Sequence, residues 1–522
     1  MSRRFDHENS TLTHRQMRRT SLPLVLLSGL LIAAPFLHLA LYFSSWISLV
    51  PLFGVLRRTI ALRDALFIGL LTGLITNLIG FYWLIYTIKV FGGLPSLLSG
   101  FVFFLFALYS AIPFAVLSLL VRRYGFGPFC LLPPLFWIAI EFWFPLLFPW
   151  HLANGQSHLL PLMQSADLVG PYGTSFLLVW VNALIFQIAK ALFSQREKIR
   201  SSLLQAAFGA AALITVLLYG HVRLGVIATK ISAAPSLSVA LVQGNISIHR
   251  KGKIALLESN LENYKKLTKK IKGANLVIWP ESAVGAWVLE ERKELPPHLA
   301  ASLPAESSFF VFGARSFTRS AAHANVKTFN SAFLTNNRGH ILSRYHKQVL
   351  LAFGETLPFA PLLSKLPWMP PIGDGFTRGE GPRTLDLSSK TKLAPLICYE
   401  DLMPRLARRF VKERGANVLV NLTNNAWFGP TAAPWQHARL SQWRAIETRR
   451  SLVRATNSGL TAVIDPRGEI LETLPTFSSG VLQTKVPIME GQTIYVRFGD
   501  WFAWLATLLS LLVLVVRRQE DR

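Results

Sequence analysis

Eight long apolar runs constrain the fold of this 522-residue chain more than any other feature of it. A bilayer leaves backbone polar groups no partner except within the segment, so runs of this length predict membrane-spanning helices. Hydrophobic residues make up 51% of the chain and charged residues only 16%, as expected for a polytopic membrane protein. The predicted spans are about 22–38, 39–56, 65–88, 97–121, 128–148, 172–189, 203–222 and 501–516.

The basic residues that flank these runs alternate between the two sides of the membrane. Because basic loops stay in the cytoplasm, this alternation predicts that both termini are cytoplasmic and that the segment between the seventh and eighth runs lies outside. It also accounts for the net charge of +26 without a nucleic-acid partner, so none is expected. The basic residues are Arg3, Arg4, Arg15, Arg18 and Arg19 before the first run, Arg57, Arg58 and Arg63 after the second, Arg122 and Arg123 after the fourth, Lys190, Arg196, Lys198 and Arg200 after the sixth, and Arg517, Arg518 and Arg522 after the eighth.

A basic tail before an apolar run also fits a cleavable signal peptide. Retaining the first run preserves the charge alternation, and the second run follows almost without a loop. We therefore expect three parts: a seven-helix membrane domain at 1–228, an extracytoplasmic domain at 229–495, and the eighth helix with a cytoplasmic tail at 496–522.

The extracytoplasmic segment has the pattern of an α/β domain. Apolar runs of strand length alternate with helical stretches such as the charged segment 255–272, and the turn sequence 465–468 separates two of the late runs. The expected strands lie at 237–242, 276–279, 308–312, 332–335, 393–397, 417–421 and 461–464.

One of these expected strands ends at Cys398, one of only two cysteines in the chain. Cys130 is expected at the cytoplasmic end of the fifth span, so the two cannot bridge and Cys398 should be a free thiol. A lone cysteine is more often a small buried hydrophobe than a nucleophile. Its place where a strand gives way to an acidic loop nevertheless suits a nucleophile, because strand ends are rigid and their loops are open to substrate.

Two further polar residues occupy similar places. Glu281 ends the run 276–280, and Lys347 precedes the apolar segment 349–351. A carboxylate can take the thiol proton, and a fixed cation can lower the thiol pKa and stabilise an oxyanion. Each residue alone is more often a solvated surface group. No zinc or nucleotide motif occurs, so no metal and no cofactor are expected.

The order and local sequence of these three residues resemble the nitrilase superfamily, whose signature is a Glu–Lys–Cys triad. Within it, the chain most resembles the apolipoprotein N-acyltransferase family, and the resemblance covers nearly the whole length. The matching motifs are Trp279-Pro280-Glu281-Ser282, Tyr345-His346-Lys347, Ile397-Cys398-Tyr399-Glu400, Val242-Gln243-Gly244-Asn245, Phe353-Gly354-Glu355, Asn424-Asn425-Ala426-Trp427-Phe428-Gly429, Pro434-Trp435-Gln436-His437, Arg454-Ala455-Thr456-Asn457-Ser458-Gly459 and Phe148-Pro149-Trp150.

The resemblance implies roles for the site residues and an αββα sandwich for the extracytoplasmic domain. Glu281 would be the general base, Lys347 the oxyanion stabiliser and Cys398 the nucleophile. Glu355 would orient Lys347 or share its charge. Asn330, Tyr399 and Glu400 fall at family active-site positions, although Glu400 is equally well a simple loop acid. The chain departs from the usual family sequence at Val349, Ala352 and Asn425, which puts rate or lipid preference in doubt more than the chemistry.

The activity that the resemblance implies is transfer of a fatty acyl chain from a phospholipid, through a Cys398 thioester, to the amino group of S-diacylglyceryl-cysteine at an apolipoprotein's N-terminus. The site would be periplasmic, in a monomer embedded in the bacterial inner (plasma) membrane. Trp427 and the apolar loop 366–371 would form a lid or dip into the interface, or else fill the core, and Glu141 would face the bundle interior. The alternatives are a membrane-anchored amidase with water as acceptor and a non-enzymatic membrane protein such as a transporter.

Overall fold

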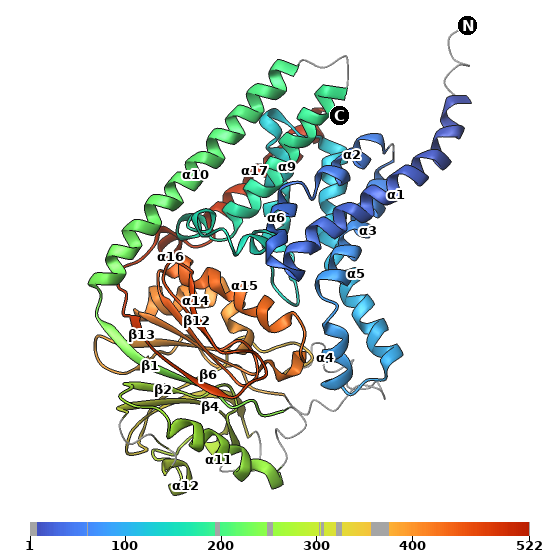
Figure 1. The fold of residues 1–522 in the computed structure, drawn as a ribbon. Coiled ribbons are helices and arrows are strands. Elements are labelled where there is room, and N and C mark those ends of the chain that lie inside the picture. Colours follow the sequence, from blue (N-terminus) through green and yellow to red (C-terminus); the bar gives the residue numbers. More distant parts are fainter. Residues whose placement is uncertain are drawn as a thin grey trace.

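A helical bundle and a two-sheet domain make up the molecule, as a computed structural model shows (Figure 1). The structure describes residues 8–59, 61–193, 199–247, 254–301, 303, 307–319, 326–356 and 375–520. The sheets lie at one end of the bundle, and the far ends of α1 and α17 lie at the other (Figure 1). The apolar loop 366–371 lies outside the described residues.

Apolar helices stand at all eight predicted spans. By length and composition, five helical segments in the described ranges can cross a membrane: 39–58, 62–80, 96–124, 172–193 and 199–233. Shorter apolar helices at 21–37, 128–143 and 501–517 occupy the other three positions. The helices of the bundle are α1 (Glu8–Leu37), η1 (Leu39–Trp46), α2 (Val50–Arg58), α3 (Leu62–Gly80), α4 (Leu84–Val90), α5 (Ser96–Tyr124), η2 (Pro128–Cys130), α6 (Leu132–Trp143), η3 (Leu152–Gln156), α7 (Leu160–Met163), α8 (Ala166–Val169), α9 (Tyr172–Phe193), α10 (Ile199–Ala233) and α17 (Trp501–Glu520).

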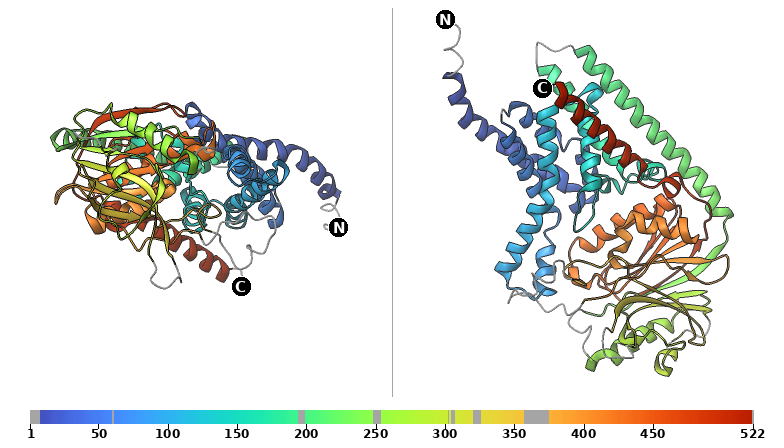
Figure 2. Two further views of the ribbon diagram at one scale, coloured as in Figure 1. Left: turned by 90° about the horizontal axis from the view of Figure 1, so that it is seen from below. Right: turned by 180° about the vertical axis from the view of Figure 1, so that it is seen from behind.

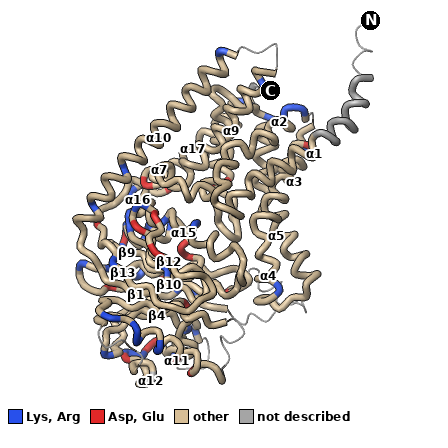
Figure 3. Tube along the Cα trace, in the orientation of Figure 1, with Lys and Arg blue, Asp and Glu red and all other residues tan. Residues whose placement is uncertain are grey.

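Two of the predicted spans differ in their details. The run 65–88 is not one helix, because α3 ends at Gly80 and α4 starts after a turn at Leu84. The run 203–222 belongs to α10, a helix of 35 residues that continues down the outside of the bundle to the sheet domain (Figure 2). Charged residues are sparse along the helices and gather at their ends and in the sheet domain (Figure 3), as a lipid-facing bundle requires.

Glu141 lies inside the bundle, as expected. Its Oε1 accepts hydrogen bonds from the Trp137 indole at 3.1 Å, the Ser175 hydroxyl at 3.1 Å and the Leu152 backbone at 2.9 Å. His151 Nδ1 lies 3.2 Å from Oε2. These partners offset the cost of removing a carboxylate from water.

The sheet domain consists of two sheets packed face to face. The first has the order β13-β1-β2-β4-β5-β6, with β3 beside β4, and the second has the order β12-β11-β10-β9-β8-β7. The strands are β1 (Ser236–Gln243), β2 (Leu276–Ile278), β3 (Val284–Leu289), β4 (Phe309–Phe317), β5 (Thr328–Asn336), β6 (Ile341–His346), β7 (Leu385–Asp386), β8 (Lys392–Ile397), β9 (Val418–Thr423), β10 (Ser451–Thr456), β11 (Ala462–Ile464), β12 (Ile470–Thr473) and β13 (Gly480–Pro487).

Helices cover both outer faces, which gives the expected αββα sandwich. On the outer face of the first sheet, α11 (Leu257–Thr268) packs Tyr264 and Leu267 onto Val242 and Trp279. The second sheet is covered by α14 (Pro404–Arg414) and α15 (Ala433–Thr448), on the side of the bundle (Figure 1). Between the sheets lies an apolar core of buried strand residues, among them Leu241, Ile278, Val311, Leu396 and Leu422.

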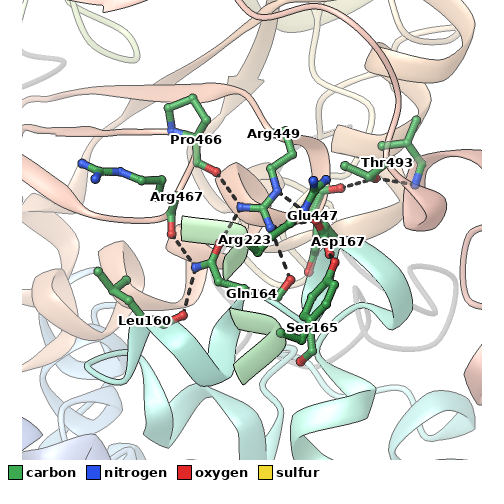
Figure 4. A network of polar contacts seen from close by, with 12 residues as sticks. Leu160, Gln164, Ser165, Asp167, Arg223, Glu447, Arg449, Pro466, Arg467 and Thr493 are labelled. Carbon is green, nitrogen blue, oxygen red and sulfur yellow. Dashed lines mark hydrogen bonds and ion pairs between the residues drawn. The ribbon is translucent and has the colours of Figure 1, made fainter. Parts of the chain in front are cut away.

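A buried polar network joins this sandwich to the bundle (Figure 4). Asp167 of α8 pairs with Arg449, which follows α15, at 2.8 Å, and with Arg223 of α10 at 2.7 Å. Arg449 Nη1 also donates to Gln164 Oε1 at 2.6 Å and to the Pro466 carbonyl at 3.1 Å. Two elements of the bundle and two loops of the sandwich therefore share one charge cluster, which fixes how the sheets sit on the helices.

Candidate active site

Three strand ends carry the predicted triad. Glu281 follows β2 and Cys398 directly follows β8, as the sequence predicts, and Lys347 directly follows β6, a strand that the sequence patterns did not predict. All three are buried, at 7%, 1% and 8% exposure. Hydrogen bonding within the sheets holds the backbone up to each residue, so the side chains extend from rigid positions.

Cys398 has an unusual backbone conformation. Its φ is 55°, in the left-handed region that non-glycine residues seldom adopt. The side chain of Asn421 on neighbouring β9 donates hydrogen bonds to the Cys398 carbonyl at 2.8 Å and to the Leu396 carbonyl at 3.0 Å. The next strand thus stabilises a sharp turn that lifts the thiol off the end of its own strand, which is how strained positions at reactive sites are usually maintained.

Lys347 lies between two carboxylates. Its Nζ is 2.7 Å from Glu355 Oε2 and 3.9 Å from Glu281 Oε1. Asn330 of β5 bridges the same two acids, because its Nδ2 donates to Glu281 Oε1 and to Glu355 Oε1, both at 2.8 Å. Glu355 thus lies beside Lys347, and Asn330 fixes the separation of the two carboxylates.

Close backbone packing fixes Glu281 itself. A side chain at Gly313 on β4 would place its Cβ 2.6 Å from the Glu281 Cα and 2.7 Å from the Pro280 carbonyl. Only glycine allows this approach. The loop that carries Glu281 can thus lie directly against β4.

The thiol is protonated in the resting site. Burial and then Glu281 raise the pKa of Cys398, Lys347 and a hydrogen bond from Thr423 lower it, and the net pKa is about 12. Burial also lowers the pKa of Lys347, but Glu355, Cys398 and Glu281 outweigh it, so the pKa is raised and the ammonium stays charged. A protonated thiol beside a carboxylate and a permanent cation can react only if a base removes its proton, which suits Glu281.

Glu400 holds the nucleophile loop in place. It is fully buried and accepts backbone hydrogen bonds from Ile397 at 2.8 Å, Gln348 at 2.7 Å and Val349 at 3.0 Å. The Tyr345 hydroxyl also donates to it at 2.9 Å. Burial raises the pKa of Glu400 to about 7, against the effect of its hydrogen-bond donors. Of the two interpretations of Glu400, support of the site fits this geometry and a solvated loop acid does not.

Aromatic residues connect the site to the bundle. Tyr399, next to the nucleophile, lies edge-on to Phe148 with ring centroids 6.3 Å apart. The ring centroids of Trp427 and Phe91, just after α4, lie 4.1 Å apart, and those of Phe428 and Trp83 lie 4.9 Å apart. Trp427 is half-buried against the bundle, so it is neither a core residue of the sandwich nor a free surface ring. The nucleophile loop and the Trp427 segment therefore lie against apolar helices of the bundle.

The sequence did not single out a buried charge network behind the nucleophile. Asp401, in the same turn as Cys398, pairs with Arg454 of β10 and lies 2.7 Å from His437 Nε2. Burial lowers the pKa of His437 to about 4, so the imidazole is neutral. Arg454 and His437 lie in motifs already noted for their resemblance, but nothing in a single sequence pairs them with Asp401. Among the described residues, no cluster of three His, Cys, Asp or Glu side chains could hold a metal.

Comparisons with known proteins match both halves of this chain. The family model of the apolipoprotein N-acyltransferase N-terminal domain matches residues 28–184, and that of carbon-nitrogen hydrolase matches 238–494. The apolipoprotein N-acyltransferase of Geobacter metallireducens is 35% identical over 92% of this chain and 92% of its own length. This chain belongs to the apolipoprotein N-acyltransferase family.

A second relative agrees with that assignment. The apolipoprotein N-acyltransferase of Ralstonia nicotianae is 32% identical over 96% of this chain and 94% of its own length. Among solved structures, the nitrilase-superfamily protein Nit3 of Saccharomyces cerevisiae is 17% identical, covers 48% of this chain and 90% of its own, and has a TM-score of 0.36. The two family models and the two N-acyltransferase relatives show that the chain is a bacterial membrane acyltransferase with a nitrilase-like domain, as its motifs predict.

Proposed function

We propose that the protein moves a fatty acyl chain from a phospholipid to the α-amino group of an S-diacylglyceryl-cysteine at an apolipoprotein's N-terminus. The observation that carries the proposal is the position of the Cys398 turn. It joins a buried carboxylate and ammonium on one side to Phe148 of the bundle on the other. A nucleophile placed between a proton-transfer pair and apolar helices suits an ester whose acyl chains remain in lipid.

In the first half-reaction Glu281 takes the thiol proton as Cys398 Sγ attacks the acyl ester carbonyl. Lys347 faces the oxyanion that forms, and Glu355 and Asn330 keep its ammonium in place. The C–O bond then breaks, and Glu281 returns the proton to the departing lysophospholipid oxygen. The product is a Cys398 thioester with the catalytic carboxylate restored.

In the second half-reaction the neutral α-amine attacks the thioester carbonyl. Glu281 takes a proton from the attacking nitrogen, the C–S bond breaks, and the proton passes to Cys398 Sγ. An amide forms and the thiol is regenerated, so no cofactor is consumed. Water would hydrolyse the thioester, which makes the buried site and its aromatic surround part of the chemistry.

The same function requires a defined domain arrangement, membrane orientation and oligomeric state. The membrane domain comprises residues 1–228, the periplasmic catalytic domain 229–495, and the last helix and cytoplasmic tail 496–522. Both termini are cytoplasmic, the protein acts as a monomer in the inner membrane, and nucleic acid plays no part. The alternating basic loops support this orientation.

The test supplies membranes that contain the wild type or Cys398→Ala with a labelled phospholipid and a diacylglyceryl-cysteine peptide. The wild type should give N-acylated peptide and lysophospholipid in equal amounts, and Cys398→Ala should give neither. Release of free fatty acid without N-acylated peptide would instead identify a hydrolase with water as the acceptor. Full activity in Cys398→Ala would refute the proposed nucleophile.

A further inference from the structure

β6 is the last strand of the first sheet, and it ends one residue before Lys347. Among the described strands β6 pairs only with β5, and the Lys347 backbone N–H donates to the Asn330 carbonyl at 2.9 Å. In an antiparallel pair of strands, successive residues direct their backbone N–H and carbonyl groups alternately toward and away from the neighbouring strand. Lys347 directs its N–H toward β5, so Arg344, three residues earlier, directs its own N–H and carbonyl away from β5. Neither group has a hydrogen-bond partner among the described residues. This position can therefore pair with another extended chain.

A cavity of about 990 Å³ lies between residues 342–346 of β6 and the segment 377–384. Its lining includes five cationic side chains, from Lys327, Arg344, Arg378, Arg383 and Arg414. The acidic side chains that line it are Glu290, Glu380 and Asp386, and Glu290 is already paired with Arg344 at 3.3 Å. Arg378 and Arg383 are exposed and form no ion pair with a described residue. The cavity thus has a surplus of positive charge.

The cavity is connected to the catalytic lysine through the backbone. The Gly379 N–H, in the cavity wall, donates to the Lys347 carbonyl at 2.9 Å. Two of the lining residues each have a buried polar atom without a hydrogen-bond partner among the described residues, namely Glu290 Oε1 and Ser343 Oγ. The cavity lining reaches His346, the residue next to Lys347, and includes no residue of the triad.

We propose that this cavity, which we call the β6 groove, binds the acceptor's polypeptide downstream of its N-terminal cysteine, as an extended and acidic segment. The inference rests on the proposed function and specifies the acceptor. An extended peptide can use the unpaired Arg344 backbone groups as an added strand, which a lipid headgroup or free anion cannot do. Arg378 and Arg383 then attract its carboxylates and raise the rate of encounter.

The experiment compares two acceptors at saturating phospholipid. One is a diacylglyceryl-cysteine peptide with a ten-residue acidic extension, and the other is diacylglyceryl-cysteine amide without an extension. In Arg378→Glu/Arg383→Glu the KM for the extended acceptor should rise about tenfold, since two exposed ion pairs of ~0.7 kcal/mol each give that factor. The KM for the short acceptor and the release of lysophospholipid should not change.

Controls separate the possible failures. Lys269→Glu/Lys270→Glu reverses the same charge on exposed positions just after α11 and should leave both acceptors unaffected. N-methylation of alternate amides in the extension should raise its KM in the wild type. An equal rise in KM for both acceptors, or no change in either KM, would contradict peptide binding in the β6 groove. The same conclusion would follow if inorganic phosphate alone raised the wild-type KM for the extended acceptor as much as the double substitution does. Wild type that acylates neither acceptor would instead refute the proposed function.

Discussion

Lys347 is held by Glu355 more closely than by the proposed base, since its Nζ lies 2.7 Å from Glu355 and 3.9 Å from Glu281. Glu355→Gln should leave a buried ammonium under-compensated. We expect lysophospholipid release to fall on the order of 100-fold, with a loss of unfolding free energy of about 3 kcal/mol. Activity and thermal unfolding of the purified protein measure both. The exposed Glu262→Gln on α11 should change neither, and a fully active Glu355→Gln would contradict the role.

The pH dependence of thiol alkylation tests the electrostatics of Cys398. Burial and Glu281 raise the pKa of Cys398 from an ordinary 9.0 to about 12, so the alkylation rate should still be rising at pH 10. Glu281→Gln removes one raising cause, and the midpoint should move to lower pH even though acyl transfer is lost. A wild-type midpoint below pH 9 would contradict the buried, protonated thiol.

His437 should make the fold acid-sensitive. The pKa of His437 in the folded protein is about 4, below the ordinary 6.5. Between these two pH values the imidazole is protonated in the unfolded chain and neutral in the folded protein. The contribution of His437 to the free energy of unfolding, about 3 kcal/mol, is fully present above pH 6.5 and is lost as the pH falls toward 4. His437→Gln keeps an N–H donor for Asp401 and should flatten the fall in Tm between pH 7 and 4.5. An unchanged slope would assign the acid sensitivity to other groups.

Asp167 and Arg449 should be strongly coupled, because their ion pair is buried between bundle and sandwich. A double-mutant cycle with Asp167→Asn and Arg449→Met should give a coupling energy of about 1–3 kcal/mol in thermal unfolding. The exposed pair Arg409 and Glu413 should give only about 0.3–0.5 kcal/mol. Equal coupling in the two pairs would mean that the junction does not depend on the Asp167 cluster.

Sequence patterns predicted the features that depend on local order. The apolar runs located the helices, and the short apolar strands placed Glu281 and Cys398 at strand ends, whereas β6 before Lys347 was not predicted because Arg344 and His346 interrupt its apolar pattern. The break between α3 and α4 was not predicted, because the segment Phe81 to Trp83 is as apolar as the residues on either side of it. The Asp401 and Arg454 pair escaped because its members lie 53 positions apart and meet only once β10 joins the sheet. Buried charges of this kind follow from tertiary contacts and not from local pattern.

The central claim is that Cys398 carries the acyl group. Intact-protein mass spectrometry after incubation with phospholipid alone, followed by peptide mapping, tests it most directly. The account predicts one acyl adduct on Cys398, which hydroxylamine removes and an added diacylglyceryl-cysteine peptide discharges, and which is absent in Cys398→Ser. Lysophospholipid release with no adduct on Cys398, or with an adduct on another residue, would contradict it.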